Sequence, residues 1–215
     1  KIQVQSDGGL IVAIISNAVT IADAGAFSAS LGSMTFIKTL TASSSANLTF
    51  VHGSASVVLD STYPIYLFKF TNIHPSGDNV TFEVNFRDGG SAYDATKTST
   101  FFRTSHREND TETVFGYSTG GGLAQETGTQ QISGGVGAEN DESGSGELLL
   151  YNPSSTTFVK HFVVNSQILS ASPQSEQSFT AGYCNTTAAI DGVQFTMSSG
   201  NIDAGTIKLY GIKDS

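Results

Sequence analysis

The acidic segment Glu139-Asn-Asp-Glu142 combines residue types that could bind an ion. Three carboxylates, those of Glu139, Asp141 and Glu142, fall within four residues, and glycines precede and follow them. Carboxylate oxygens crowded in a loop are typical ligands of Ca²⁺. The spacing, however, lacks the alternate ligand positions, the fixed glycine and the terminal glutamate of an EF-hand loop. Solvated loop charge is therefore the favoured interpretation, and calcium binding is the lesser one.

The four histidines do not form a metal-binding or catalytic motif. They stand at positions 52, 74, 106 and 161, and neither His-Glu-x-x-His nor Cys-x-x-Cys occurs. No Gly-Lys-Ser/Thr follows the glycine-rich runs, as a phosphate-binding loop requires. Nineteen acidic residues offer many carboxylate pairs, so their number alone cannot support a glycosidase. We expect no catalytic residue, no cofactor and no enzymatic activity.

The composition argues against several classes of function. Ten Lys and Arg stand against nineteen Asp and Glu, giving a formal net charge of −9, and no clustered basic face of a nucleic-acid-binding protein is visible. The apolar run Leu10–Ile15 is far shorter than the roughly 20 residues of a membrane-spanning helix. The single cysteine, Cys184, cannot form an internal disulfide, and we expect it to be a buried, small hydrophobic residue. Neither nucleic acid nor a membrane is expected as a partner.

Short strands are the elements expected to position any site. The segment Val80–Phe86 alternates strictly between apolar and polar residues, which is typical of a half-buried strand. Ile65–Phe70 is nearly continuously apolar, and the turn-forming residues His74–Asp78 between the two runs predict a hairpin or neighbouring strands. Further strands are expected at 34–40, 48–50, 57–59, 147–151, 158–164, 193–197 and 206–212. This pattern predicts an all-β, antiparallel two-sheet β-sandwich that is jelly-roll-like.

Two segments differ from this pattern. Residues 1–33 are rich in small residues, with strand-like runs at 2–4, 10–15 and 19–21. They are interpreted either as an extended N-terminal arm that adds a strand to a neighbouring subunit, or as extra strands on the domain formed by residues 34–215. Residues 116–146 contain three glycine-rich runs and predict a long excursion that is either mobile or elaborately looped. Loops within 103–146 are expected to face solvent or a host surface, because binding functions often lie on loops.

Glycine and aspartate residues between the expected strands predict tight turns. Glycine adopts backbone angles that other residues disfavour, and an aspartate side chain can accept a hydrogen bond from a nearby backbone N–H. The residues expected to form these turns are Gly77, Asp78, Asp88, Gly89, Gly90, Gly200, Asp203 and Gly205. Substituting them is expected to damage folding before it damages any binding.

Aromatic residues indicate an alternative function, that of a carbohydrate-binding module or a receptor-binding domain. Such a sandwich presents aromatic side chains on an exposed face or at loop tips. The main candidates are Tyr93, Phe115 and Tyr117, followed by Phe101, Phe102 and Tyr183. The absence of Trp counts against this alternative, because Trp has the largest aromatic surface for stacking. A glycan-cleaving depolymerase is a third alternative, and it would need paired acids in a groove.

Six segments along residues 34–215 together resemble a β-sandwich domain of structural proteins in tailed bacteriophages, including marine ones. They are Tyr63-Pro-Ile-Tyr-Leu-Phe68, Asn72-Ile-His-Pro-Ser-Gly-Asp78, Asp88-Gly-Gly-Ser-Ala-Tyr93, Gly144-Ser-Gly-Glu-Leu-Leu-Leu-Tyr-Asn-Pro153, Ile190–Met197 and Ser199-Gly-Asn-Ile-Asp-Ala-Gly-Thr-Ile-Lys-Leu-Tyr-Gly-Ile212. Each segment alone has little specificity, and their order along the chain carries the resemblance.

The resemblance implies a non-enzymatic virion protein, namely a capsid-decoration, head-fibre or tail-fibre subunit. It carries no catalytic residue that could be transferred to this sequence. It implies a location on the phage particle, contacts with other virion proteins and self-assembly, with a homotrimer as the favoured state. Host-surface glycan is a further expected partner.

Overall fold

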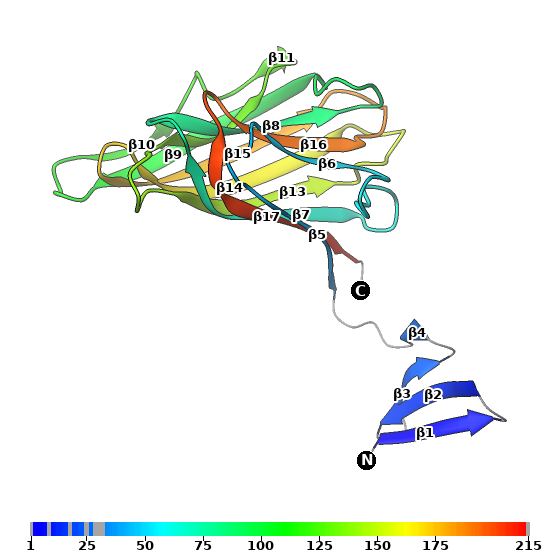
Figure 1. Ribbon diagram of the computed structural model, residues 1–215. Coiled ribbons are helices and arrows are strands. Elements are labelled where there is room, and N and C mark those ends of the chain that lie inside the picture. The colour runs from blue at the N-terminus through cyan, green and yellow to red at the C-terminus, as the bar shows by residue number, and fades with distance from the viewer. Residues whose placement is uncertain (1, 8–9, 17–18, 24–25, 28–32, 214–215) are drawn as a thin grey trace. The chain divides into compact units, whose positions relative to one another are not determined.

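The computed structural model describes residues 2–7, 10–16, 19–23, 26–27 and 33–213. The chain divides into two compact units, and the boundary lies between Met34 and Thr35. The first unit contains β1 (Ile2–Asp7), β2 (Leu10–Ser16), β3 (Val19–Asp23) and β4 (Ala26–Phe27), labelled in Figure 1. These strands pair in chain order, all antiparallel. The segment expected as an extended arm thus pairs its strands with one another.

The second unit is built from antiparallel strands, so the all-β, antiparallel class predicted from the sequence is confirmed. The described residues contain no helix, and hence none that could cross a membrane. The strands are β5 (Met34–Thr41), β6 (Leu48–Val51), β7 (Ile65–Pro75), β8 (Val80–Arg87), β9 (Lys97–Arg107), β10 (Thr113–Tyr117), β11 (Ala124–Glu126), β12 (Gln130–Val136), β13 (Gly144–Tyr151), β14 (Lys160–Ser170), β15 (Gln174–Cys184), β16 (Gly192–Met197) and β17 (Ile202–Ile212).

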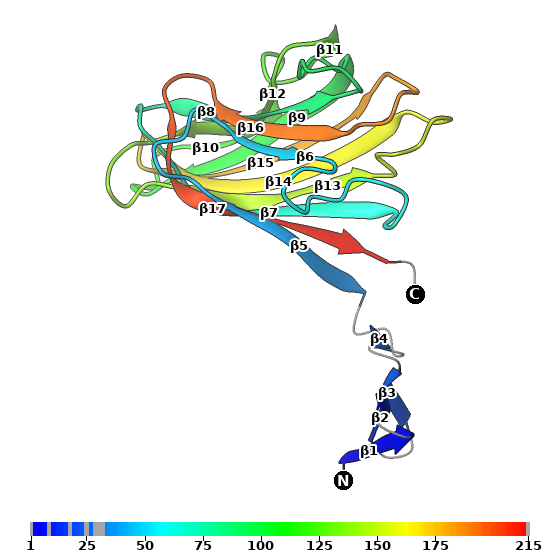
Figure 2. The same ribbon diagram turned by 45° about the vertical axis from the view of Figure 1, so that its right-hand side comes forward.

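Two groups of strands make up this unit. The small group has the order β6-β16-β8-β12, and the large group has the order β5-β17-β7-β13-β14-β15-β9, with β10 and β11 both paired to β9. One bridge, Val136 to Ser170, joins β12 to β14, so the sheet curls until it nearly closes. Figure 2 shows β6, β16 and β8 lying across from β7, β13 and β14.

Aromatic rings fill the space between the two groups. The Phe70 ring on β7 contacts that of Phe82 on β8, with centroids 5.3 Å apart, and Phe195 on β16 contacts Phe68 at 5.7 Å. The hairpin predicted for 65–86 is therefore wrong: β7 pairs with β17 and β13, whereas β8 pairs with β12 and β16. The two strands face each other across the core because both bury large apolar side chains there. The turn between them begins only at Ser76, since β7 runs to Pro75.

Two further predictions about the chain are wrong. Residues 57–59 are not a strand, although Val57 and Leu59 are buried, and the Leu59 N–H donates to His52 Nδ1 at 3.1 Å instead of to a neighbouring strand. Residues 116–146 are not one long loop, because they contain β11 and β12. The glycines of β12 serve close packing: a Cβ at Gly134 would overlap the carboxylate of Glu176.

Candidate functional site

The large strand group turns one face to the core and the other outward. On β14 the outward side chains Asn165 and Gln167 are exposed, whereas Val164, Ser166 and Ile168 between and beside them are buried. This strict alternation follows from the two-residue period of a strand. Side chains at opposed register positions on adjacent strands therefore lie beside one another on the outer face.

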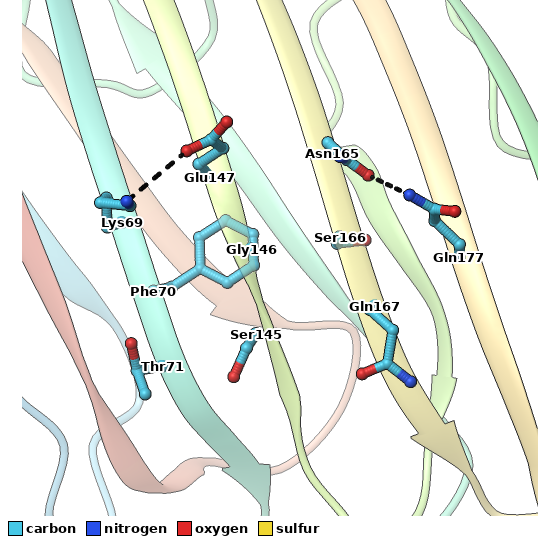
Figure 3. A pocket seen from close by; sticks show the side chains of 10 residues that line it. All are labelled: Lys69, Phe70, Thr71, Ser145, Gly146, Glu147, Asn165, Ser166, Gln167 and Gln177. Carbon is cyan, nitrogen blue, oxygen red and sulfur yellow. Dashed lines mark hydrogen bonds and ion pairs between the residues drawn. The ribbon is translucent and has the colours of Figure 1, made fainter.

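A groove of about 350 Å³ crosses this outer face where β13 carries two small residues, Ser145 and Gly146 (Figure 3). Gly146 is opposite Phe70 and Ser166, both buried, so it lies on the inner face of the sheet. A Cβ built there would lie 2.8 Å from Cε2 of Phe70 and would overlap the carbonyl oxygen of Asn165, so close packing beneath the groove needs glycine at this position. The lining residues of the groove are Lys69, Phe70, Thr71, Ser145, Gly146, Glu147, Asn165, Ser166, Gln167 and Gln177.

Amide side chains supply most of the polar groups of the groove. Nε2 of Gln177 donates to Oδ1 of Asn165 at 3.0 Å, which fixes both amides and leaves the Asn165 NH₂ and the Gln177 carbonyl oxygen for other partners. Nε2 of Gln167 donates to the backbone carbonyl of Ile168 at 2.8 Å. The two charged residues, Lys69 and Glu147, pair with each other at 3.9 Å and balance in charge (Figure 3).

An aromatic shelf begins one strand beyond Asn165, and it consists of Phe179, Phe102, Phe115 and Tyr117. The rings of Phe102 and Phe179 are stacked, with centroids 4.9 Å and planes 15° apart, and Phe115 meets Phe102 edge to face at 6.1 Å. Phe115 is 79% exposed and Tyr117 is 59% exposed. Large apolar rings that face solvent are unusual in a protein with an ample core, and clusters of them indicate a binding surface.

Strand register places the groove and the aromatic shelf in one line across the sheet. Asn165 is opposite Phe179, Phe179 is opposite Phe102, and Phe102 is opposite Tyr117. On the other side, Glu147 is opposite both Asn165 and Lys69, and the line continues to the exposed Lys208 on β17, which is opposite Lys69. We call the resulting line the cross-strand row; its members are Lys69, Glu147, Asn165, Phe179, Phe102 and Tyr117. The row combines hydrogen-bond donors and acceptors with aromatic rings.

The structure unites two of the three main aromatic candidates and separates the third. Phe115 and Tyr117 both lie on β10 in the aromatic shelf. Tyr93 instead packs at the small strand group, with the guanidinium carbon of Arg87 6.0 Å from its ring centroid. Burial is the main cause that raises the pKa of Tyr93, and the nearby Arg87 charge opposes it. Phe101 points inward and is buried, and Tyr183 contacts His161 on the outer face, 6.2 Å between centroids.

The acidic residues of the calcium candidate do not converge. Glu139 and Asp141 are exposed, whereas Glu142 is buried and its Oε2 accepts a hydrogen bond from the backbone N–H of Glu139 at 2.7 Å. The Glu142 carboxylate thus closes its own turn. Throughout the part of the chain that the structure describes, no three His, Cys, Asp or Glu side chains are grouped as metal ligands.

The expected turn residues occupy several kinds of position. Gly89 and Gly200 lie between strands with φ of +106° and +73°, in the left-handed region that favours glycine. Asp203 and Gly205 lie inside β17, where the register with β7 shifts at bulges. The side chain of Asp78 accepts a hydrogen bond from the Ala138 N–H at 3.2 Å. Gly77 belongs to the β7–β8 turn, and Asp88 and Gly90 lie in the connection that follows β8.

One segment fits the Gly-x-Ser-x-Gly pattern of a nucleophile elbow, Gly116-Tyr-Ser-Thr-Gly120. That motif works by placing its serine on a sharp turn from a strand into a helix. Here β10 ends at Tyr117, and a turn follows it with no helix. The Ser118 N–H donates to the carbonyl of Phe101 at 2.9 Å. The context of an elbow is missing from this segment.

Two buried lysines flank the single cysteine. Cys184 is opposite Lys97 on β9 and Lys160 on β14, and all three are fully buried. Nζ of Lys97 donates to Oδ1 of Asn85 at 2.6 Å and to the carbonyl of Ala95 at 2.7 Å. Burial lowers the pKa of Lys97 to about 8 and raises the pKa of Cys184 to about 12. A thiol held protonated in this way is inert, so the cluster is structural.

Sequence reasoning missed Asn165, Gln177 and Phe179, although it identified Phe115, Tyr117 and Phe102 as candidates. Phe179 and Gln177 lie on β15, a strand that the apolar pattern does not reveal because its inward residues, Glu176, Ser178 and Thr180, are polar. The sequence signal that could have indicated these three residues was the low density of charged residues in 160–184.

Comparison with known proteins identifies no relative of this chain. No protein-family model, no curated protein and no solved structure matches it. The fold and the surface geometry therefore carry the functional argument.

Proposed function

We propose that this protein is a non-enzymatic structural subunit of a bacteriophage particle, a capsid-decoration, head-fibre or tail-fibre subunit, whose outer sheet face contacts host-surface glycan. The observation that carries the glycan contact is the cross-strand row, in which the amide of Asn165, bonded to that of Gln177, adjoins the aromatic shelf with its exposed Tyr117. The virion location is supported by the order of the six sequence segments that resemble phage structural proteins. The same surface on a protein outside a virion would be a carbohydrate-binding module, which is the alternative.

Strand order supports a jelly-roll-like, two-sheet sandwich as the finer fold. Eight strands form two sets of four, β5-β17-β7-β13 and β6-β16-β8-β12. Numbered one to eight along the chain, these sets read 1-8-3-6 and 2-7-4-5, the order produced when a long hairpin of strands is rolled up. Strands β9–β11 and β14–β15 are then insertions that widen the first sheet. Jelly rolls are common in viral capsid and lectin domains, which is an analogy at the level of fold.

The chemistry of the row fits a sugar. A sugar hydroxyl both donates and accepts hydrogen bonds, and the amides of Asn165 and Gln177 offer both functions. The C–H face of a sugar ring is apolar and slightly positive, so it stacks on the negative face of an aromatic ring. Phe179 lies directly beside the Asn165 amide, and Phe115 and Tyr117 on β10, which are 79% and 59% exposed, present such rings to solvent.

The groove supports binding without cleavage. A glycosidase uses two carboxylates that flank the scissile bond. Of the residues that line the groove, only Glu147 is acidic, and it is paired with Lys69. The depolymerase alternative thus gains no support from this surface.

A virion subunit must assemble with copies of itself or with other virion proteins. A homotrimer is expected, with residues 1–33 as the assembly or attachment segment and other virion proteins as partners. Light scattering of the full chain is expected to give three times 22.5 kDa. Deleting residues 1–33 is expected to leave a monomer, and a trimer of the shortened chain would assign assembly to the second unit.

Retention on immobilised neutral polysaccharides from bacterial surfaces tests the glycan contact. The full chain is expected to bind without releasing reducing sugars, and Phe102→Ala is expected to weaken binding about ten-fold, since losing one stacking contact costs about 1.4 kcal/mol. Phe158→Ala removes a ring that is 72% exposed in the loop before β14, outside the row, and serves as the matched control. Failure of the full chain to bind any of these polysaccharides would contradict the proposal.

A further inference from the structure

The β5 end of the large strand group carries lysines on neighbouring strands. Lys69 on β7 is opposite Lys208 on β17, and both are exposed. On the same outer face, Phe36 of β5 contacts Tyr210 of β17 edge to face, with ring centroids 5.7 Å apart. Because β5 runs antiparallel to β17 and side chains on one face recur every second residue, Lys38 lies beside Lys208. We call Lys38, Lys208 and Lys69 the lysine end.

The charges of the lysine end are poorly compensated within the chain. Like charges directly opposed on neighbouring strands are destabilising. Glu147 pairs with Lys69 at 3.9 Å, whereas neither Lys38 nor Lys208 forms an ion pair with any residue that the structure describes. Asp203 lies five residues before Lys208 on β17, and its Oδ1 accepts a hydrogen bond from the hydroxyl of Ser44 at 2.9 Å. Unbalanced charge that costs stability indicates a surface for an anionic partner.

Apolar side chains and an open strand edge adjoin the lysine end. Met34 and Phe36 on β5 are 48% and 56% exposed. Among the described strands, β5 pairs with β17 alone, so its other edge is open. An open edge with exposed apolar side chains is a surface that another chain can join. In sequence, β5 directly follows residues 1–33, the segment proposed to assemble the subunits.

The opposite end of the same strand group is acidic. There β9 and β10 pair as a hairpin, and their connection carries Glu108, Asp110 and Glu112, all exposed. Arg107 is the basic residue beside them and pairs with Glu112 at 2.6 Å, and its N–H donates to the Glu112 carbonyl at 3.0 Å. The carboxylate of Asp110 contacts only the ring of His106, at 2.9 Å. The charges of Glu108 and Asp110 therefore project from a closed turn, which we call the acidic connection.

Opposite charges at two different ends of one subunit suit a head-to-tail contact. A heterologous contact joins two different surfaces of the same chain, and it generates a ring when its rotation closes. A homotrimer built in this way has three identical contacts, each between the lysine end of one copy and the acidic connection of the next. A contact between two like ends would instead bring lysine against lysine or carboxylate against carboxylate, which is unfavourable.

We infer that the subunits of the proposed trimer contact one another head to tail, with the acidic connection of one copy docked on Lys38, Lys208 and Phe36 of the next. This inference rests on the proposed self-assembly and adds the two contact surfaces and their polarity. Residues 1–33 remain necessary for assembly, because exposed ion pairs each contribute little.

Charge reversal at either end, and then at both, tests the contact. Lys38→Glu with Lys208→Glu reverses the lysine end, and Glu108→Lys with Asp110→Lys reverses the acidic connection. In light scattering of the full chain, each double variant is expected to need at least about ten-fold more protein than the wild type for half assembly, since like charges then meet at every contact. The chain with all four substitutions is expected to assemble like the wild type, because the attraction returns with its ends exchanged.

A matched control separates this effect from a change of net charge. Glu126→Lys reverses an exposed acidic residue on β11, outside both ends, and is expected to leave the mass unchanged. Thermal unfolding of every variant shows whether it folds.

The outcomes separate the inference from the proposal beneath it. A full chain that is monomeric at every concentration would contradict the proposed self-assembly itself. A trimer that withstands both double variants would overturn the head-to-tail contact and leave self-assembly standing. Failure of the folded fourfold variant to assemble would show that these two ends do not pair with each other.

Discussion

Replacing Lys97 by methionine is expected to change how the stability of this protein depends on pH. Lys97 is fully buried, and burial lowers its pKa from 10.5 to about 8. In the unfolded chain the amine keeps its ordinary pKa, so between pH 8 and 10.5 the unfolded state binds more protons than the native state. The free energy of unfolding therefore rises with pH in this window. Below pH 8 both states are protonated, and the native state carries the full cost of the buried charge.

The magnitude follows from the two pKa values. A difference of one between the native and unfolded pKa corresponds to about 1.4 kcal/mol, so the gain over the whole window is about 3 kcal/mol, of which about 1 kcal/mol appears between pH 7 and 9. Cys184 acts in the opposite sense: its pKa is raised from 9.0 to about 12, so stability is lost as the pH rises above 9. At pH 9 half of the unfolded-state thiols are already ionised, which costs about 0.4 kcal/mol, so Lys97 is separated from the cysteine by comparing the wild type with Lys97→Met, in which Cys184 is kept.

Urea unfolding at pH 7, 8 and 9 measures this effect. From pH 7 to pH 9 the free energy of unfolding of the wild-type protein is expected to rise by about 1 kcal/mol more than that of Lys97→Met. Lys208→Met, which replaces an exposed lysine on β17, is the matched control and is expected to follow the wild type. Parallel pH dependences for the wild type and Lys97→Met would contradict this prediction, because they would mean that Lys97 has the same pKa in the native and unfolded states.

Three further predictions concern the scaffold. Phe195→Ala is expected to lower the free energy of unfolding by about 3–5 kcal/mol in urea titrations, since its ring joins the two strand groups; a loss below about 1 kcal/mol would contradict that placement. Gly205→Ala is expected to cost more than Gly53→Ala: both have positive φ, but only at Gly205 would a Cβ meet backbone, 2.5 Å from the carbonyl oxygen of Asn72. The Cys184 thiol is expected to react with a thiol reagent only after unfolding, and rapid labelling of the native protein would show that it is accessible.

The sequence predicts strands well where their inward residues are apolar. Val80–Phe86 became β8 almost residue for residue, because its apolar positions face the core on every second residue. Strands β9 and β15 were missed, because their inward positions carry groups such as Ser99, Glu176 and Ser178. These polar side chains lie in an interior that also holds Gln130, whose Nε2 donates to the carbonyl of Gly121 at 2.8 Å. Hydrophobic periodicity cannot reveal a strand that packs against a polar interior.

The candidate site could be predicted only in part, for a different reason. Aromatic residue type alone identified Phe102, Phe115 and Tyr117. The groove depends on Asn165 and Gln177 meeting across β14 and β15, beside Ser145 and Gly146 of β13. Such contacts are set by strand register, and a shift by one residue would turn each of these side chains to the other face.

Chemical-shift mapping with a bound oligosaccharide locates the glycan-binding surface. The protein, of 22.5 kDa, would be labelled with ¹⁵N and titrated with an oligosaccharide prepared from a neutral polysaccharide that retains it. The largest shifts are expected on β14, β15 and β9, around Asn165, Phe179 and Phe102, and the oligosaccharide is expected to stay intact. Shifts concentrated elsewhere, such as around Phe158 or Glu139, would show that the cross-strand row is not the binding surface.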